Sequence, residues 1–313
     1  GFAEVIYDNT AQTFMPAIVH TDQLEKANGR LWSAELVTNT FIGPPLGALL
    51  LVVAFSFPFF VDAGTFIVSA ALIALIPATK RVPKPASAGA APPSWTTELQ
   101  VGFRWLWNHD LLRPMAVILG LLNMLGTMST ATMVLFAQEV LETSPTEFAL
   151  LSTGGAVGGA LGGWTASQIA QRIGSGPSLY LTLIVGGLTT FLIGFATHWL
   201  FVWAMFAIFM LLAVLWNVIT VSLRQTIIPD ELLGRVNSVY RFFAWGMMPI
   251  GAALGGLTVF VTDAFGPREL ALRMPFFVAG TLNVALFFFA APRLTSAKID
   301  GARSAGMANS SVS

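Results

Sequence analysis

The chain has 313 residues, of which 55% are hydrophobic and 10% are charged, and its mean hydropathy is +0.73. Soluble domains are typically about 25% charged, so this composition excludes an ordinary soluble enzyme and favours a membrane protein. The formal net charge of zero gives no reason to expect a nucleic-acid partner, and the lack of cysteine excludes disulfides and thiolate metal sites.

Apolar segments follow one another along most of the chain, each close to the roughly 20 residues that a membrane-spanning helix needs. In chain order they cover residues 1–19, 33–55, 57–79, 112–137, 148–170, 178–197, 199–226, 237–262 and 272–292. The sequence therefore predicts an all-α polytopic membrane protein with nine spans. The histidines His20, His109 and His198 are isolated, so no metal site, cofactor site or enzymatic activity is expected.

Two parts of the chain interrupt or follow this pattern. Residues 80–111 begin as a linker rich in Pro, Ala, Ser and Gly and end in an amphipathic helix from Thr96 to His109, which we expect on the membrane surface. Residues 294–313 are polar and rich in small side chains, and we expect a disordered tail there. With the linker on the inside, 14 of the 16 basic residues lie on the same side of the membrane. The positive-inside bias then places the linker and the C-terminus in the cytoplasm.

A near-repeat relates the two ends of the chain. Residues Ile18–Asn28 align without gaps to Ile227–Asn237, 209 positions later, and Gly47 and Gly256 follow at the same distance. A duplicated unit within apolar sequence indicates a transporter built from two similar helical bundles.

Four short stretches resemble the major facilitator superfamily, and most closely its bacterial exporter branch of macrolide-efflux-like and enterobactin-exporter-like proteins. They are Leu24–Gly29, Phe41–Gly47, Val61–Phe66 and, as the most specific, Pro229–Asn237. The resemblance implies two six-span halves joined by a cytoplasmic linker. On this reading residues 1–79 are the remainder of the N-terminal bundle (spans four to six), 80–111 are the linker, and 112–293 are the C-terminal bundle (spans seven to twelve). About three N-terminal spans are then missing from the chain.

The resemblance also implies that spans four, seven and ten line a central cavity. In span four, Glu4, Asp8 and Gln12 recur every four residues and share one helical face. A carboxylate near the bilayer midplane is costly unless it is protonated or paired, so Glu4 or Asp8 is a candidate for proton or cation binding. The alternative is a structural hydrogen bond. Candidate wall residues of spans seven and ten are Asn123, Thr127, Trp216 and Asn217, although packing between helices would also explain them.

Other residues are candidates for structural or gating roles. Arg172 lies in a degraded copy of the family's Gly-x-x-x-Asp-Arg-x-Gly loop and is either a cytoplasmic latch or a plain positive-inside arginine. Glu35 is expected to pair with Arg30 or the latch loop, and Asp62 to cap span six. The remaining candidates are Gly43, Pro44 and Gly47, which resemble a proline motif of antiporters, and Arg235 within the repeat.

The leading hypothesis is a monomeric secondary transporter of a bacterial inner membrane that exports an amphipathic small molecule in exchange for protons. A siderophore or lipid translocator of the same fold and an inactive fragment remain alternatives. A membrane-embedded enzyme is disfavoured because no nucleophile motif or phosphate-binding loop is present.

Overall fold

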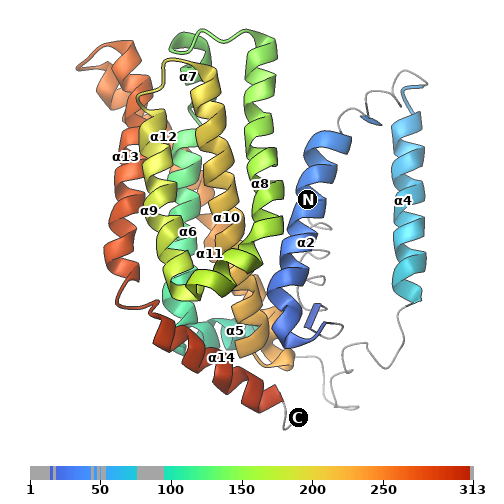
Figure 1. Ribbon diagram of the computed structural model, residues 1–313. Helices are drawn as coiled ribbons and strands as arrows, with labels where there is room; N and C mark the ends of the chain where they lie inside the picture. The colour runs from blue at the N-terminus through green and yellow to red at the C-terminus, as the bar shows by residue number, and fades with distance from the viewer. Residues whose placement is uncertain are drawn as a thin grey trace.

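A computed structural model of the protein describes residues 15–16, 19–43, 46–47, 50, 54–75 and 95–310, and within these ranges it contains helices and no strand (Figure 1). Before the linker lie η1 (Thr21–Gln23), α2 (Leu24–Val37), the π-helical turn η2 (Thr38–Ile42) and α4 (Phe57–Ala74). After it lie α5 (Trp95–Asn108), α6 (Leu112–Thr130), α7 (Met133–Glu139), α8 (Pro145–Ile173), α9 (Ser175–Ile193), α10 (Trp199–Ile227), α11 (Asp230–Gly246), α12 (Met248–Asp263), α13 (Arg268–Ala290) and α14 (Ser296–Ser310).

Five helical stretches of the described residues are long and apolar enough to cross a membrane. They are Leu112–Glu139, Ser175–Ile193, Trp199–Ile227, Asp230–Asp263 and Arg268–Ala290. The helix α8 is as long as α10 but less apolar, because glycine and polar side chains occupy much of it. Residues 1–14, which hold most of the first expected span, and parts of the next two lie outside the described residues, so the count of nine spans stays a prediction.

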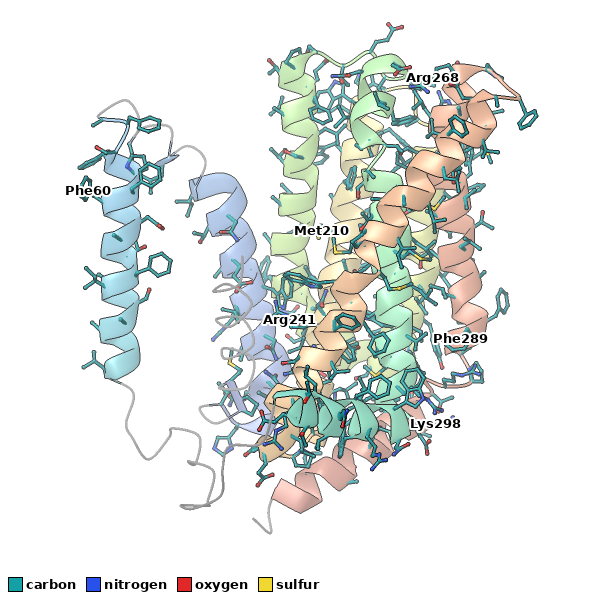
Figure 2. The ribbon with its side chains drawn as sticks, turned by 180° about the vertical axis from the view of Figure 1, so that it is seen from behind. Phe60, Met210, Arg241, Arg268, Phe289 and Lys298 are labelled. Atoms are coloured by element: carbon teal, nitrogen blue, oxygen red, sulfur yellow. The ribbon has the colours of Figure 1, made fainter. Side chains whose placement is uncertain are left out.

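The helix α10 is the centre of the bundle. Leu215, Ile219 and Leu223 are fully buried in a core that also includes side chains of α6, α8, α9, α11 and α14. The neighbouring helix α8 approaches it closely, because a Cβ atom on Gly158 would overlap the backbone of Ala207. The helix α2 packs against both α8 and α10, whereas α4 stands apart and none of its described side chains is buried (Figures 1 and 2).

Capping side chains fix where several helices begin. Ser144 and Glu147 form a reciprocal capping box at the start of α8, where Pro145 occupies a position that needs no backbone N–H. His109 precedes α6, and its Nδ1 accepts hydrogen bonds of 3.2 Å from the backbone N–H groups of Leu111 and Leu112. Burial lowers the pKa of His109, and the charge of Asp110 opposes this shift. The neutral ring is the form that accepts these bonds.

Two of the expected spans are broken into two helices each. The stretch 112–137 is divided between α6 and α7. Near the break, the hydroxyls of Ser129, Thr130 and Thr132 donate to carbonyls three or four residues back, and they compete there with the backbone N–H groups of the helix. The stretch 237–262 is divided at Met247, and Pro249 follows in the first turn of α12. A proline there supplies no N–H to continue α11.

The helices that carry the repeat begin earlier than expected. The apolar pattern places their starts at 33 and 237, but α2 begins at Leu24 and α11 at Asp230. Acidic side chains favour the first turn of a helix, as Glu25 and Asp230 do here. Both copies of the repeated asparagine therefore lie inside a helix, past its first turn.

The expectation of a disordered tail over 294–313 is wrong for most of that segment. Residues 296–310 form α14, on which Ile299 is fully buried and Gly306 lies against the backbone of Thr226 at the end of α10. Ile299, Ala302 and Gly306 recur at helical spacing and face the bundle. Composition alone does not reveal this narrow stripe, because most other residues of the segment are small or polar.

Candidate functional site

A cavity of about 380 Å³ lies where α2 meets α6, α10 and α11; we call it the charged cavity. It is lined by Asn28, Leu31, Trp32, Glu35, Leu119, Asn123, Asn217, Val221, Arg224, Tyr240, Arg241, Ala244, Trp245 and Met248. Arg241 projects from α11 (Figure 2), and its guanidinium lies 4.9 Å from the centre of the Trp245 ring. The cavity thus joins residues from before the linker to residues from after it.

A second cavity of about 250 Å³ lies among α6, α9, α10 and α13; we call it the neutral cavity. It is lined by Leu119, Leu122, Asn123, Gly126, Thr127, Thr130, Thr182, Gly186, Phe209, Met210, Leu212, Ala213, Trp216, Asn217 and Asn283. Leu119, Asn123 and Asn217 line both cavities, so the two adjoin. The four wall residues predicted for spans seven and ten, Asn123, Thr127, Trp216 and Asn217, all lie here.

Hydrogen bonds hold several of these polar side chains in place. Asn123 Nδ2 donates to the carbonyl of Ala244 at 2.7 Å and so ties α6 to α11. The Thr127 hydroxyl donates to the carbonyl of Asn123 at 2.8 Å, and Asn217 Nδ2 donates to that of Ala213 at 2.9 Å. The cavity walls are therefore partly preorganised.

Several polar side chains at the cavities hold a buried atom without a hydrogen-bond partner among the described residues, and three of these atoms matter here. They are Trp216 Nε1 and Asn283 Oδ1 at the neutral cavity and the Tyr240 hydroxyl at the charged cavity. Buried polar groups are almost always paired, so these atoms mark places where another molecule can bond. Asn283 is absent from the sequence-based candidates. An amide within the last apolar segment was the available signal.

Arg224 is a buried cation that sequence reasoning treated only as a positive-inside residue. It is 4% exposed, lies 4.0 Å from the centre of the Tyr240 ring, and donates to Asn237 Oδ1 at 3.1 Å and to the Thr220 carbonyl at 3.3 Å. No carboxylate of the described residues forms an ion pair with it. A buried arginine in such a position supplies a fixed positive charge at the wall of the charged cavity.

The two repeated asparagines both bond to the same part of α10. Asn28 Nδ2 donates to the Ser222 hydroxyl at 3.1 Å and to Gln225 Oε1 at 2.7 Å, while Asn237 accepts from Arg224. Both asparagines are almost fully buried, with exposures of 2% and 1%. The repeat therefore marks the sites at which α2 and α11 attach to α10.

Close contacts surround the attachment of α2. The Ser33 hydroxyl donates to the carbonyl of Ala160 on α8 at 3.1 Å, and a Cβ atom on Gly163 would overlap Ser33 and Gly29. Arg303 on α14 forms an ion pair with Glu25 at the start of α2. The end of α2 that begins at Leu24 is thus held by α8, α10 and α14 together.

The structural candidates are found in varied surroundings. Arg235 forms an ion pair of 2.9 Å with Glu98 of α5, and Arg172 lies exposed in the last turn of α8, as expected for a cation at a helix C-terminus. Glu35 lines the charged cavity. Asp62 lies beyond the first turn of α4, so the expectation that it caps this helix is wrong.

The remaining candidates lie at or beyond the edge of the described part. Gly43 and Gly47 have described positions, and an added Cβ would meet the carbonyl of Thr38 at Gly43 and nothing at Gly47. Pro44 lies outside the described residues. Also outside them are Glu4, Asp8 and Gln12. Their roles therefore stay predictions.

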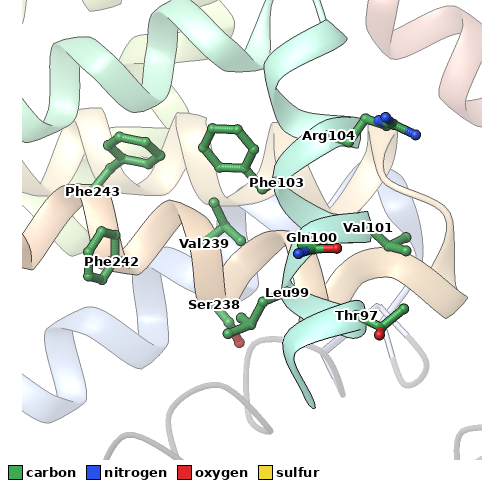
Figure 3. A pocket seen from close by; sticks show the side chains of 10 residues that line it. All are labelled: Thr97, Leu99, Gln100, Val101, Phe103, Arg104, Ser238, Val239, Phe242 and Phe243. Carbon is green, nitrogen blue, oxygen red and sulfur yellow. The ribbon is translucent and has the colours of Figure 1, made fainter. Parts of the chain in front are cut away.

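A larger hollow than these two cavities, of about 830 Å³, is a groove between α5 and α11 (Figure 3). Its walls include Leu99, Phe103, Val239, Phe242 and Phe243, and none of the predicted site residues lines it. Phe242 is 73% exposed, so we expect lipid chains to cover this groove in a membrane. The smaller internal cavities are the better candidates for a site, because they bring polar and apolar side chains from several helices together.

Comparisons with known proteins agree with this arrangement. A sequence model of the Major Facilitator Superfamily matches residues 1–252. The enterobactin exporter EntS of Citrobacter koseri is 29% identical over 253 residues, which cover 79% of this chain and 58% of that protein. EntS of Escherichia coli O1:K1 / APEC is 28% identical with the same coverage, so the chain spans less than two thirds of the length of these curated relatives.

Among solved structures, the chain is similar to a bacterial homologue of the iron transporter ferroportin in an outward-facing state. The TM-score is 0.67 at 18% sequence identity, with 92% of this chain and 69% of that chain covered. At this identity the likeness shows the fold alone.

Proposed function

Because the chain belongs to the Major Facilitator Superfamily, we propose that it forms the larger part of a secondary transporter that exports an amphipathic small molecule by alternating access. The family resemblance read from the sequence motifs is confirmed by the family match. Since the superfamily consists of transporters, the chain is not an enzyme. The bacterial inner membrane, with linker and C-terminus in the cytoplasm, and a monomeric state belong to the same proposal.

One observation carries the proposal: the charged cavity lies between α2, which precedes the linker, and α6, α10 and α11, which follow it, and the neutral cavity adjoins it among the helices after the linker. In alternating access, two bundles rock about a site at their interface. The neutral cavity offers apolar side chains with a few polar groups, as sites for amphipathic ligands do. The charged cavity is lined by Glu35, Arg224 and Arg241, whose charges can attract or repel an ion that enters it.

Export is favoured over import by the relatives, since the similar proteins of Citrobacter koseri and Escherichia coli are named enterobactin exporters. The same similarity favours a second candidate, a siderophore translocator; a lipid translocator remains a further alternative. For coupling, we infer that Glu4 or Asp8 binds the proton, since both lie on one face of the first apolar segment. Gln12 extends that face.

The test uses cells that express the complete protein. Accumulation of ethidium and of a panel of neutral and cationic amphipathic compounds is measured with and without a proton uncoupler. We expect accumulation to fall on expression, to recover with the uncoupler, and to recover in the Glu4→Gln variant. Glu142→Gln, an exposed carboxylate between α7 and α8, is the matched control and should export normally. If every compound of the panel accumulates equally in cells with and without the protein, export of amphipathic compounds is refuted.

Coupling and activity are tested separately. Full export by both Glu4→Gln and Asp8→Asn would remove these carboxylates from the coupling mechanism. Comparing the 313-residue chain with a chain extended at its N-terminus tests the inactive-fragment alternative. Export only by the extended chain would support that alternative.

A further inference from the structure

The neutral cavity has no charged side chain among the described residues that line it. This separates it from the adjoining charged cavity, which includes Glu35, Arg224 and Arg241. Moving an ion from water into a site with no opposite charge is strongly unfavourable. A ligand group that enters the neutral cavity is therefore expected to be uncharged.

Two buried polar atoms of this cavity take no part in the hydrogen bonds of its lining residues. The hydroxyls of Thr127, Thr130 and Thr182 each donate to a carbonyl of their own helix. Trp216 Nε1 then remains as a buried donor and Asn283 Oδ1 as a buried acceptor, and neither has a partner among the described residues. Both side chains are more than nine-tenths buried, at 2% and 5% exposure.

The size and lining of the cavity favour an aromatic ring. An apolar cavity of about 150 Å³ accommodates benzene, so the cavity of about 250 Å³ has room for one ring with a polar substituent. Phe209, Met210 and Trp216 supply aromatic and thioether surface, and such groups contact rings favourably.

We propose that the neutral cavity is a binding subsite for an uncharged aromatic group that carries both a hydrogen-bond acceptor, for Trp216 Nε1, and a hydrogen-bond donor, for Asn283 Oδ1. The inference rests on the proposed function, because this group would be part of the exported molecule. Asn283 and Trp216 are then the residues that select ligands by their polar groups, while the ring is held by apolar contact. Asn283 lies on α13, outside the helices that the family resemblance assigns to the cavity wall.

The test measures saturable binding of small probes to the purified protein in lipid nanodiscs by ligand-observed NMR. Benzamide has one ring, a carbonyl acceptor and N–H donors, and it is neutral. The related probe N,N-dimethylbenzamide keeps the ring and the acceptor but lacks the donor, and benzoate carries a charge. We expect benzamide to bind tightest, N,N-dimethylbenzamide about fivefold more weakly, as for one lost net hydrogen bond, and benzoate not at all.

Two conservative variants assign the bonds. Asn283→Leu should weaken benzamide about fivefold and leave N,N-dimethylbenzamide unchanged, because that probe has no donor to lose. Trp216→Phe keeps an aromatic side chain but removes the N–H donor, and it should weaken both probes about fivefold. Thr258→Val, at a half-buried position of α12 that lines neither cavity, is the control and should change neither.

The outcomes separate this subsite from other roles of the same atoms. Equal binding of benzoate and benzamide to the unmodified protein, or no saturable binding, would overturn the proposal even if a variant fails to fold. Unchanged benzamide binding in both variants would also overturn it and would indicate that water alone satisfies these atoms. The binding experiment does not measure transport. If the probes bind as expected but the cells show no export, the proposed function is refuted and the subsite is still supported.

Discussion

Replacing Gly163 by Ala should open the contact between α2 and α8. Gly163 lies on α8, and the added Cβ would lie 2.5 Å from the Gly29 carbonyl oxygen and would overlap the Ser33 hydroxyl. The Gly29 oxygen and the Ser33 nitrogen, which would lie 2.9 Å from the added Cβ, are backbone atoms of α2 and cannot turn aside as a long side chain would. The helix α2 must therefore shift as a whole.

The magnitude follows from packing energies. Inserting a methyl group into a tight contact costs about 1–3 kcal/mol. Alanine is also a better helix former than glycine by up to about 1 kcal/mol, but α8 is helical whether or not α2 is docked, so this gain cancels. The equilibrium between docked and undocked α2 should then shift by about 5- to 150-fold.

Cross-linking reports this equilibrium directly, because the chain has no native cysteine. Arg30 of α2 and Gln168 of α8 line one small pocket, so cysteines introduced at these two positions can be joined by a short bifunctional reagent. We expect Gly163→Ala to lower the cross-linking yield, because the fraction of molecules with α2 docked falls. Gly256→Ala is the matched control, since no atom lies within 4 Å of its added Cβ. An unchanged yield in Gly163→Ala would refute the tight contact.

Three further predictions concern the bundle and the end of it against which α14 packs. Gly158→Ala should reduce the free energy of unfolding by about 1–3 kcal/mol, because the added Cβ would overlap Ala207, and the thermal midpoint of unfolding should fall accordingly. An unchanged midpoint would contradict the close packing of α8 and α10. The pKa of His109 is lowered in the folded state, so its cap contributes stability, about 1 kcal/mol, that is complete above pH 6.5 and is lost as the pH falls through the lowered value. His109→Asn keeps a capping side chain and should flatten this part of a stability-versus-pH curve; an unaltered curve would exclude the cap. Arg303→Gln should speed hydrogen exchange in α14 up to about fivefold, and exchanging the charges of Glu25 and Arg303 should restore it; failure of the exchanged pair would show that the ion pair does not hold α14.

The sequence predicted the helical class correctly, and it named four residues that the structure places at one cavity. Hydrophobic period and segment length indicate spans without any tertiary information, and Asn123, Thr127, Trp216 and Asn217 were found because polar residues are rare in such segments. They do line one cavity. Their roles in transport still rest on the proposal.

Tertiary contacts explain what the sequence did not reveal. Arg224 looked like other positive-inside residues, because its burial depends on Tyr240 and Asn237 from the following helix. The helix α14 forms because Ile299 and Gly306 find complementary surface at the end of α10, which no local pattern shows. The break at 131–132 depends on local side-chain hydrogen bonds, and the break at 247 depends on Pro249. The average hydrophobicity of a span shows neither.

The repeat acquires a different meaning in each copy. Asn237 binds Arg224 within the part of the chain that follows the linker, so this bond is kept when the bundles move as rigid bodies. Asn28 binds Ser222 and Gln225 across the two parts, so the proposed rocking would break these bonds. One duplicated side chain thus stabilises a bundle in one copy and closes the interface in the other. Sequence symmetry identifies equivalent positions, and only the asymmetric placement of α10 decides which of the two bonds would break in the proposed transport cycle.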